Sequence, residues 1–189
     1  MQYIILSLVL SVFQPEWQDV DTIDDFTLVD ATSNADFSLS QLRNSAAVVV
    51  VFTTLNCPYD KLYVDRIGSL IDQYTKKDVR FILINSSPSS ANSSLEMADR
   101  IRSLRWNSPY LIDNEQEVAN SFGVEKSPTT YVLKPVSQSF QVLYSGSIDD
   151  NPQVSSDVTK HYLGMALDAV LQGSPVVIDS TYPTGCMIK

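Results

Sequence analysis

The chain of 189 residues contains two cysteines, Cys57 and Cys186, which stand in different settings. Cys57 follows an apolar run at residues 48–52 and a polar turn at residues 53–56, and it directly precedes a segment with helical periodicity. A thiol at the start of a helix faces unpaired backbone N–H groups and the positive end of the helix dipole, which favour negative charge. Because the thiolate is the nucleophilic form of cysteine, the sequence predicts a reactive thiol at Cys57. The alternative is a buried core cysteine with no chemistry.

The neighbours of Cys57 carry further candidate roles. Thr54 has a hydroxyl that could hydrogen-bond a thiolate or a peroxide, or it simply ends the strand. Pro58 begins the predicted helix, and Tyr59 either shields the thiol or lies exposed at the turn. Asp60 falls in the first helical turn, where a carboxylate competes for the same N–H groups and repels a thiolate, which raises the thiol pKa.

Composition excludes several classes of function. The net charge is −9 and the 13 Lys and Arg residues form no basic stripe, which argues against nucleic acid or an anionic membrane surface as partner. The single histidine, His161, and two distant cysteines give no zinc spacing and no Ser–His–Asp triad. With 6 glycines and no Gly-rich phosphate loop, we expect no nucleotide, metal or other cofactor.

The first 13 residues form an apolar segment that stops at Gln14 and Pro15. A membrane-spanning helix needs about 20 apolar residues, so stable membrane insertion is not expected. The length of this apolar core matches a secretory signal peptide, although no Lys or Arg precedes it. We therefore expect residues 1–13 to be a signal peptide and the protein to be exported. The alternative is a first strand or a buried N-terminal segment in a cytoplasmic protein.

Strand and helix patterns alternate through one predicted domain at residues 14–175, and a tail without strong periodicity follows at residues 176–189. We expect strands at residues 26–30, 37–40, 46–53, 79–85, 110–112, 129–133 and 141–144, the last two forming a hairpin around residues 134–140. Helices are expected from Pro58 to Tyr74, from a capping box at Ser93 to Leu104, from Asp113 to Phe122, and at residues 156–172.

These features together resemble the thioredoxin superfamily, in particular its redoxin branch, the alkyl hydroperoxide reductase/thiol-specific antioxidant group and exported thioredoxin-like proteins. The strand, the turn and Cys57 match the strand–loop–cysteine–helix unit, and Ser127-Pro128-Thr129 matches the cis-proline motif. The resemblance covers about residues 24–173. It implies an α/β fold, a three-layer α/β/α sandwich with a mixed central sheet and an N-terminal β-hairpin extension, and a location in the bacterial periplasm.

The same resemblance assigns roles to several residues. Ser127 and Pro128, together with Pro58 and Tyr59, are expected to line a substrate groove. The loop at Ser127 and Pro128 is expected to pack against the sulfur, and its backbone to pair with a substrate chain. Thr54 matches the peroxiredoxin threonine three residues before the cysteine, whereas Val50 replaces a peroxiredoxin proline and Lys126 is the nearest substitute for the peroxiredoxin arginine.

One departure from thioredoxins and one further resemblance concern the tail. Thioredoxins place their second cysteine where this chain has Asp60, so a dithiol cycle within residues 57–60 is impossible. The ending Gly185-Cys186-x-Ile188-Lys189 resembles that of bacterial redoxins with a Cys-Pro-Tyr site, in which the tail cysteine could resolve or staple Cys57. Pairing requires the two Cα atoms to come within about 7 Å.

Two hypotheses remain. In the first, the protein is a thiol oxidoreductase or thiol peroxidase that uses Cys57 as nucleophile, with Cys186 as a possible resolving cysteine and a thiol/disulfide protein or a small peroxide as partner. In the second, it is a redox-inert module that binds extended peptides, with a Cys57–Cys186 staple. The sequence does not predict the oligomeric state.

Overall fold

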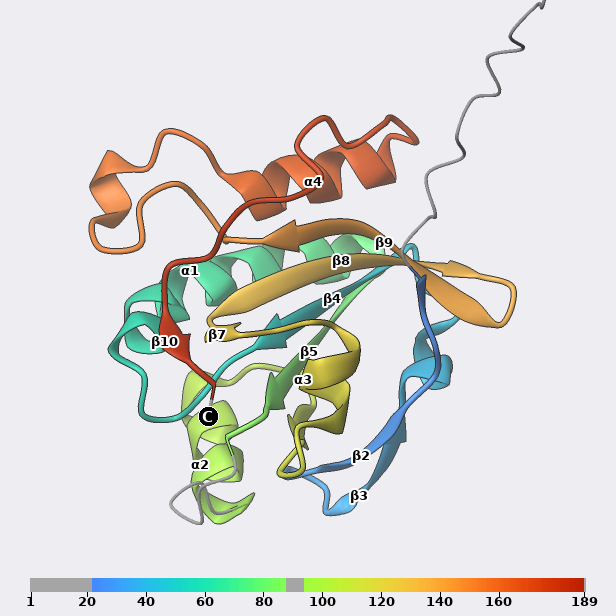
Figure 1. Cartoon of the computed structure of the whole chain (residues 1–189), viewed down its shortest axis with the longest axis vertical. Helices are drawn as coiled ribbons and strands as arrows, with labels where there is room; N and C mark the ends of the chain where they lie inside the picture. The colour runs from blue at the N-terminus through green and yellow to red at the C-terminus, as the bar shows by residue number, and fades with distance from the viewer. Residues whose placement is uncertain (1–21, 88–93, 189) are drawn as a thin grey trace, which may run out of the picture.

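The computed structural model describes residues 22–87 and 94–188, which form a layered α/β structure around an eight-stranded mixed sheet (Figure 1). In spatial order the strands are β1 (Thr22–Ile23), β9 (Ser139–Gly146), β8 (Thr129–Val136), β4 (Ala47–Phe52), β5 (Val79–Asn85), β6 (Tyr110–Ile112), β2 (Thr27–Asp30) and β3 (Ala35–Ser38). Strands β4, β5 and β6 are parallel, and β8 runs antiparallel to β4. The predicted mixed sheet and N-terminal hairpin are confirmed.

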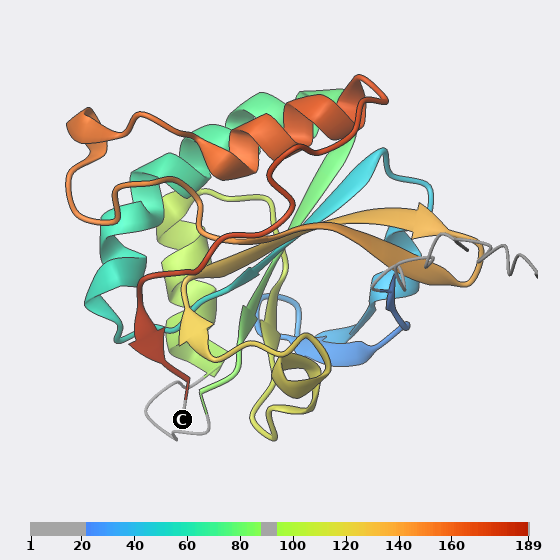
Figure 2. The same cartoon turned by 45° about the horizontal axis from the view of Figure 1, so that its top comes forward.

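Helices cover both faces of this sheet (Figure 2). The helices α1 (Pro58–Tyr74), α2 (Ser94–Leu104) and α4 (Tyr162–Leu171) pack on one face and form the first core; α3 (Glu117–Ser121) and the 3₁₀ turn at Leu39–Leu42 pack on the other and form the second core. All six residues of β4 are buried and alternate between the two cores, as expected for a strand covered on both sides. The three-layer prediction is therefore confirmed.

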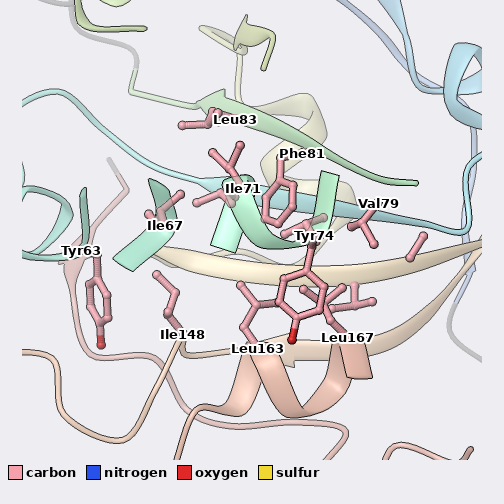
Figure 3. Packing of buried hydrophobic residues seen from close by; sticks show 14 of the residues in the cluster. Tyr63, Ile67, Ile71, Tyr74, Val79, Phe81, Leu83, Ile148, Leu163 and Leu167 are labelled. Atoms are coloured by element: carbon pink, nitrogen blue, oxygen red, sulfur yellow. The ribbon is translucent and has the colours of Figure 1, made fainter. Parts of the chain in front are cut away.

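The first core holds α1 in place above β4. The apolar face of α1, which the helical spacing predicts, meets β5 and α4 through Ile67, Ile71 and Tyr74 (Figure 3). Tyr74 also donates hydrogen bonds to the carbonyl oxygen of Gly164 (3.2 Å) and to Oδ1 of Asp168 (2.9 Å). These contacts fix the axis of α1, and with it the position of the residue that precedes its first turn.

Three element boundaries differ from the predictions. Strands β8 and β9 extend to a two-residue turn, so the predicted loop at residues 134–140 is mostly strand. Helix α4 starts at Tyr162 rather than residue 156, because Asp150 accepts hydrogen bonds from Thr159 and holds the preceding segment outside the helix. Helix α3 starts at Glu117, although the Asp113 carboxylate still caps it by accepting two of its first N–H groups.

Some predictions concern residues outside the described part. The signal peptide at residues 1–13 and the capping residue Ser93 both belong to the undescribed segments. Within residues 22–87 and 94–188, no helix is both long and apolar enough to cross a membrane.

Candidate functional site

Cys57 occupies the N-cap position of α1, and the helix begins at Pro58 as predicted. The backbone at Cys57 is extended (φ −73°, ψ 125°), because β4 and its turn deliver the chain to the helix from the carboxyl end of the sheet. The side chain is 3% exposed. The sulfur therefore sits at the positive end of a long helix, where a thiolate is stabilised.

Cys57 is joined to Cys186 by a disulfide across 129 residues, with the two Cα atoms 5.9 Å apart. The tail reaches this position as a strand, β10 (Cys186–Met187), which pairs antiparallel with β7 (Lys126–Ser127). Figures 1 and 2 show β10 between the start of α1 and β7. The pairing that the resemblance suggested is thus present in the structure.

The cis-proline loop completes the surroundings of the sulfur. The Ser127–Pro128 peptide bond is cis, as the motif implied, and both residues are buried. The carbonyl oxygen of Ser127 lies 3.5 Å from Sγ of Cys57. This loop therefore contacts the sulfur directly, while its backbone pairs with the tail on the neighbouring strand β7.

Asp60 links the turn before Cys57 to this loop. Its Oδ2 accepts hydrogen bonds from the Thr54 N–H (2.7 Å), the Thr54 hydroxyl (3.1 Å) and the Ser127 hydroxyl (3.1 Å). Among the described residues, its Oδ1 is buried without a hydrogen-bond partner. We expected this carboxylate to compete for the helix N–H groups; instead the buried side chain accepts its hydrogen bonds from Thr54 and Ser127.

Burial raises the pKa of Asp60, and the hydrogen bonds from Thr54 and Ser127 oppose this shift. A raised pKa means that the carboxyl keeps its proton to a higher pH than an ordinary aspartate.

The remaining candidates lie around this centre rather than on the sulfur. Pro58 is exposed and Tyr59 half-buried on the first turn of α1. Lys126, considered above as a substitute for the peroxiredoxin arginine, places its Nζ 4.3 Å from the ring centroid of Tyr182 in the tail. Arg100 was missed by the sequence reasoning; from α2 its Nη1 lies 3.5 Å from the carbonyl oxygen of Thr54 and holds the turn.

A second contact fastens the tail before it reaches Cys57. We call residues 179–181 the tail anchor. The Ser145 N–H donates to the Asp179 carbonyl, and the Thr181 N–H donates to the Ser145 carbonyl, each at 2.9 Å. The Ser147 N–H donates to the Thr181 hydroxyl at 2.8 Å. The tail contributes no periodic pattern to the sequence, so this anchor could not be predicted.

Residues 20–138 match the AhpC/TSA family. The chain belongs to this family. Its fold is similar to that of an uncharacterised conserved protein from Geobacillus kaustophilus, with a TM-score of 0.81 and 29% identity over 89% of this chain and 90% of the other. A hypothetical protein from Sinorhizobium meliloti 1021 has a TM-score of 0.79 and 28% identity over 89% and 93%.

A less similar solved structure shares the fold alone. The peroxidoxin BcpB from Mycobacterium tuberculosis has a TM-score of 0.60 and 21% identity over 81% of this chain and 95% of the other. The comparison with curated proteins gives no match. The family and its thioredoxin-like redoxin fold are established.

Proposed function

We propose that the protein is a thiol–disulfide oxidoreductase that uses Cys57 as nucleophile and Cys186 as resolving cysteine. The observation that carries the proposal is the Cys57–Cys186 disulfide itself, formed between a helix N-cap and a strand paired beside the cis-proline loop. Two cysteines in contact at the end of a helix dipole have the parts that thiol–disulfide exchange needs.

The proposed reaction has two exchange steps. The Cys57 thiolate attacks one sulfur of a partner's disulfide, and the partner's other sulfur leaves as a thiolate that takes a proton from water. The Cys186 thiolate then attacks the sulfur of Cys57 and releases the partner's first sulfur. Two electrons pass to the partner, whose disulfide becomes two thiols, and the Cys57–Cys186 bond is formed.

A protein disulfide suits these surroundings better than a small peroxide. The Thr54 hydroxyl, which a peroxide would need, already donates to Asp60, and the Lys126 ammonium group contacts a tail tyrosine. Strand β7, by contrast, presents its backbone to an extended chain beside the sulfur. These contacts support a polypeptide substrate.

The test is a reaction of the reduced protein with oxidised glutathione at pH 7, followed by acid quenching and mass spectrometry. We expect the wild-type protein to end as the intramolecular disulfide without an adduct, and C186S to retain one glutathione on Cys57. C57S serves as the matched control and should form an adduct on Cys186 much more slowly. If Cys57 of C186S reacts no faster than a free cysteine, the proposal is wrong and the disulfide is a structural staple.

An oxidising compartment is part of the proposal, because disulfides persist in exported proteins and are rare in reducing cytosol. Export to the periplasm is consistent with the apolar N-terminal segment in the sequence. Rapid acid quenching of cells that make the full chain, followed by alkylation of free thiols, tests the location. The expected result is a mixture of both redox forms in the exported fraction; a fully reduced cytoplasmic protein would contradict it.

A further inference from the structure

The tail occupies the edge of β7 in the way that an extended partner chain would. Cys186 is in register with Ser127 and Met187 with Lys126, and the Ile188 N–H donates to the Glu125 carbonyl at 2.9 Å. Figures 1 and 2 show this segment lying along β7. The backbone groups of β7 are therefore used by the protein's own tail while the disulfide is closed.

Gly185 passes so close to the cis-proline loop that a side chain has no room. A Cβ atom added there would lie 2.0 Å from the carbonyl oxygen of Ser127 and 2.6 Å from its carbonyl carbon. Both atoms belong to a buried backbone that a rotamer change cannot move. The described glycines with positive φ are Gly123, Gly146 and Gly173, so Gly185 is needed for space rather than for its backbone conformation.

The two positions after Cys186 differ from Gly185 in the side chains that they can accommodate. Met187 is 53% exposed, so this position tolerates many side chains. Ile188 is half-buried and packs against the second core. An extended chain bound here would thus present glycine, cysteine, a variable residue and an apolar residue in that order.

From this we infer that the protein's partner is a polypeptide that binds along β7 in place of the tail, with glycine immediately before the cysteine that exchanges with Cys57. The inference rests on the proposed function and adds the recognition element of its substrate. The tail is then a competitor: the partner pairs with β7 only after the segment beyond the tail anchor has left.

The tail anchor confines the replacement of the tail by a partner to the residues after Thr181. Thr181 is held by Ser145, Ser147 and the Tyr144 hydroxyl through contacts that do not involve the disulfide. Opening the disulfide therefore removes the covalent hold on the chain after residue 181, and the β10–β7 pairing can then separate while the tail anchor stays on β9. The freed cysteine stays close enough to return as the resolving thiol.

The test uses hexapeptides with the sequence of residues 184–189 and the same sequence with alanine in place of glycine. Each peptide carries its cysteine as a mixed disulfide with 2-thiopyridine. Attack by the Cys57 thiolate on the peptide sulfur forms the protein–peptide disulfide and releases 2-thiopyridone, which is followed by absorbance. The proteins are full-length C186S and G185V/C186S, and the small reagent 2,2′-dithiodipyridine reports the intrinsic reactivity of Cys57.

We expect the glycine peptide to react with C186S at least tenfold faster than the alanine peptide. It should react faster still with G185V/C186S, whose own tail no longer fits the edge of β7. Equal rates for the two peptides, with Cys57 reactive toward dithiodipyridine, would overturn the inference and leave the proposed function standing.

If Cys57 reacts slowly, a binding measurement tests peptide recognition by β7 separately from the reactivity of Cys57. Peptides with serine in place of cysteine are titrated into ¹⁵N-labelled G185V/C186S, and amide shifts of β7 are followed. Shifts with the glycine peptide alone support glycine-dependent binding along β7 even if Cys57 proves unreactive, a result that would remove the proposed function and the exchange with Cys57 but not the binding. Equal shifts, or none, with both peptides refute it.

Discussion

The disulfide should contribute a large share of the free energy of unfolding, because it closes a long loop. The cysteines are 129 residues apart, and the chain-entropy relation for a loop of that length gives about 5 kcal/mol at 25 °C. Replacing Cys186 by serine removes the cross-link and leaves the strand pairing of β10 with β7 possible. We therefore expect the free energy of unfolding of C186S to be about 5 kcal/mol lower than that of the oxidised wild type.

Urea unfolding followed by far-UV circular dichroism measures this difference. With a slope of about 2 kcal/mol/M, the midpoint should fall by about 2 M or more. Reductant should move the wild-type midpoint toward that of C186S and leave C186S unchanged, which is the internal control. A difference below about 1 kcal/mol between the oxidised wild type and C186S would show that the tail is not covalently closed onto Cys57.

Other consequences concern buried groups near the site and the tail. Because burial raises the pKa of Asp60, the stability of the wild type relative to D60N should be greatest below pH 3.8 and decline as the pH rises through the raised value; parallel urea midpoints across pH would contradict this. G146A should lower the free energy of unfolding by about 1–3 kcal/mol and loosen the tail anchor, because its Cβ would lie 2.2 Å from the Thr181 carbonyl oxygen. G123A, also at positive φ but in open space, is the control and should lower it by about 1 kcal/mol. Thermal melts compare the two variants. R66M should lower the free energy of unfolding, measured in urea, by about 3–5 kcal/mol. The reason is that the buried Asp149 side chain, 2% exposed, loses its ion-pair partner at 2.6 Å. A loss under about 1 kcal/mol would show that other contacts satisfy the buried charge.

The fold follows from the sequence because local patterns and the global arrangement agree. The continuous apolar run of β4 predicted a strand covered on both faces, and the helical spacing after Pro58 predicted α1 to its last residue. The cis-Pro128 motif could likewise be identified from three residues. Each of these signals depends on neighbours in the chain.

What escaped prediction depends on contacts between distant segments. The tail has no periodicity of its own, and its two anchoring strand contacts exist only because β7 and β9 offer free backbone edges. Arg100 reaches the turn before Cys57 from another helix, with no motif to mark it. The role of Asp60 as a hydrogen-bond acceptor for Thr54 and Ser127 also required the folded geometry. Glycine at residue 185 was noticed as part of an ending, but its lack of a side chain has meaning only against the carbonyl of the cis-proline loop.

The central claim is that Cys57 and Cys186 form a reversible redox pair. Equilibration of the protein in glutathione and dithiothreitol buffers of known potential, with thiols trapped in acid and counted by mass spectrometry, measures it directly. We expect a single two-electron transition with a midpoint above about −300 mV, in the range of exchanging disulfides. A pair that stays closed at potentials well below about −300 mV would instead be a structural staple, and Cys57 and Cys186 would not be a redox pair.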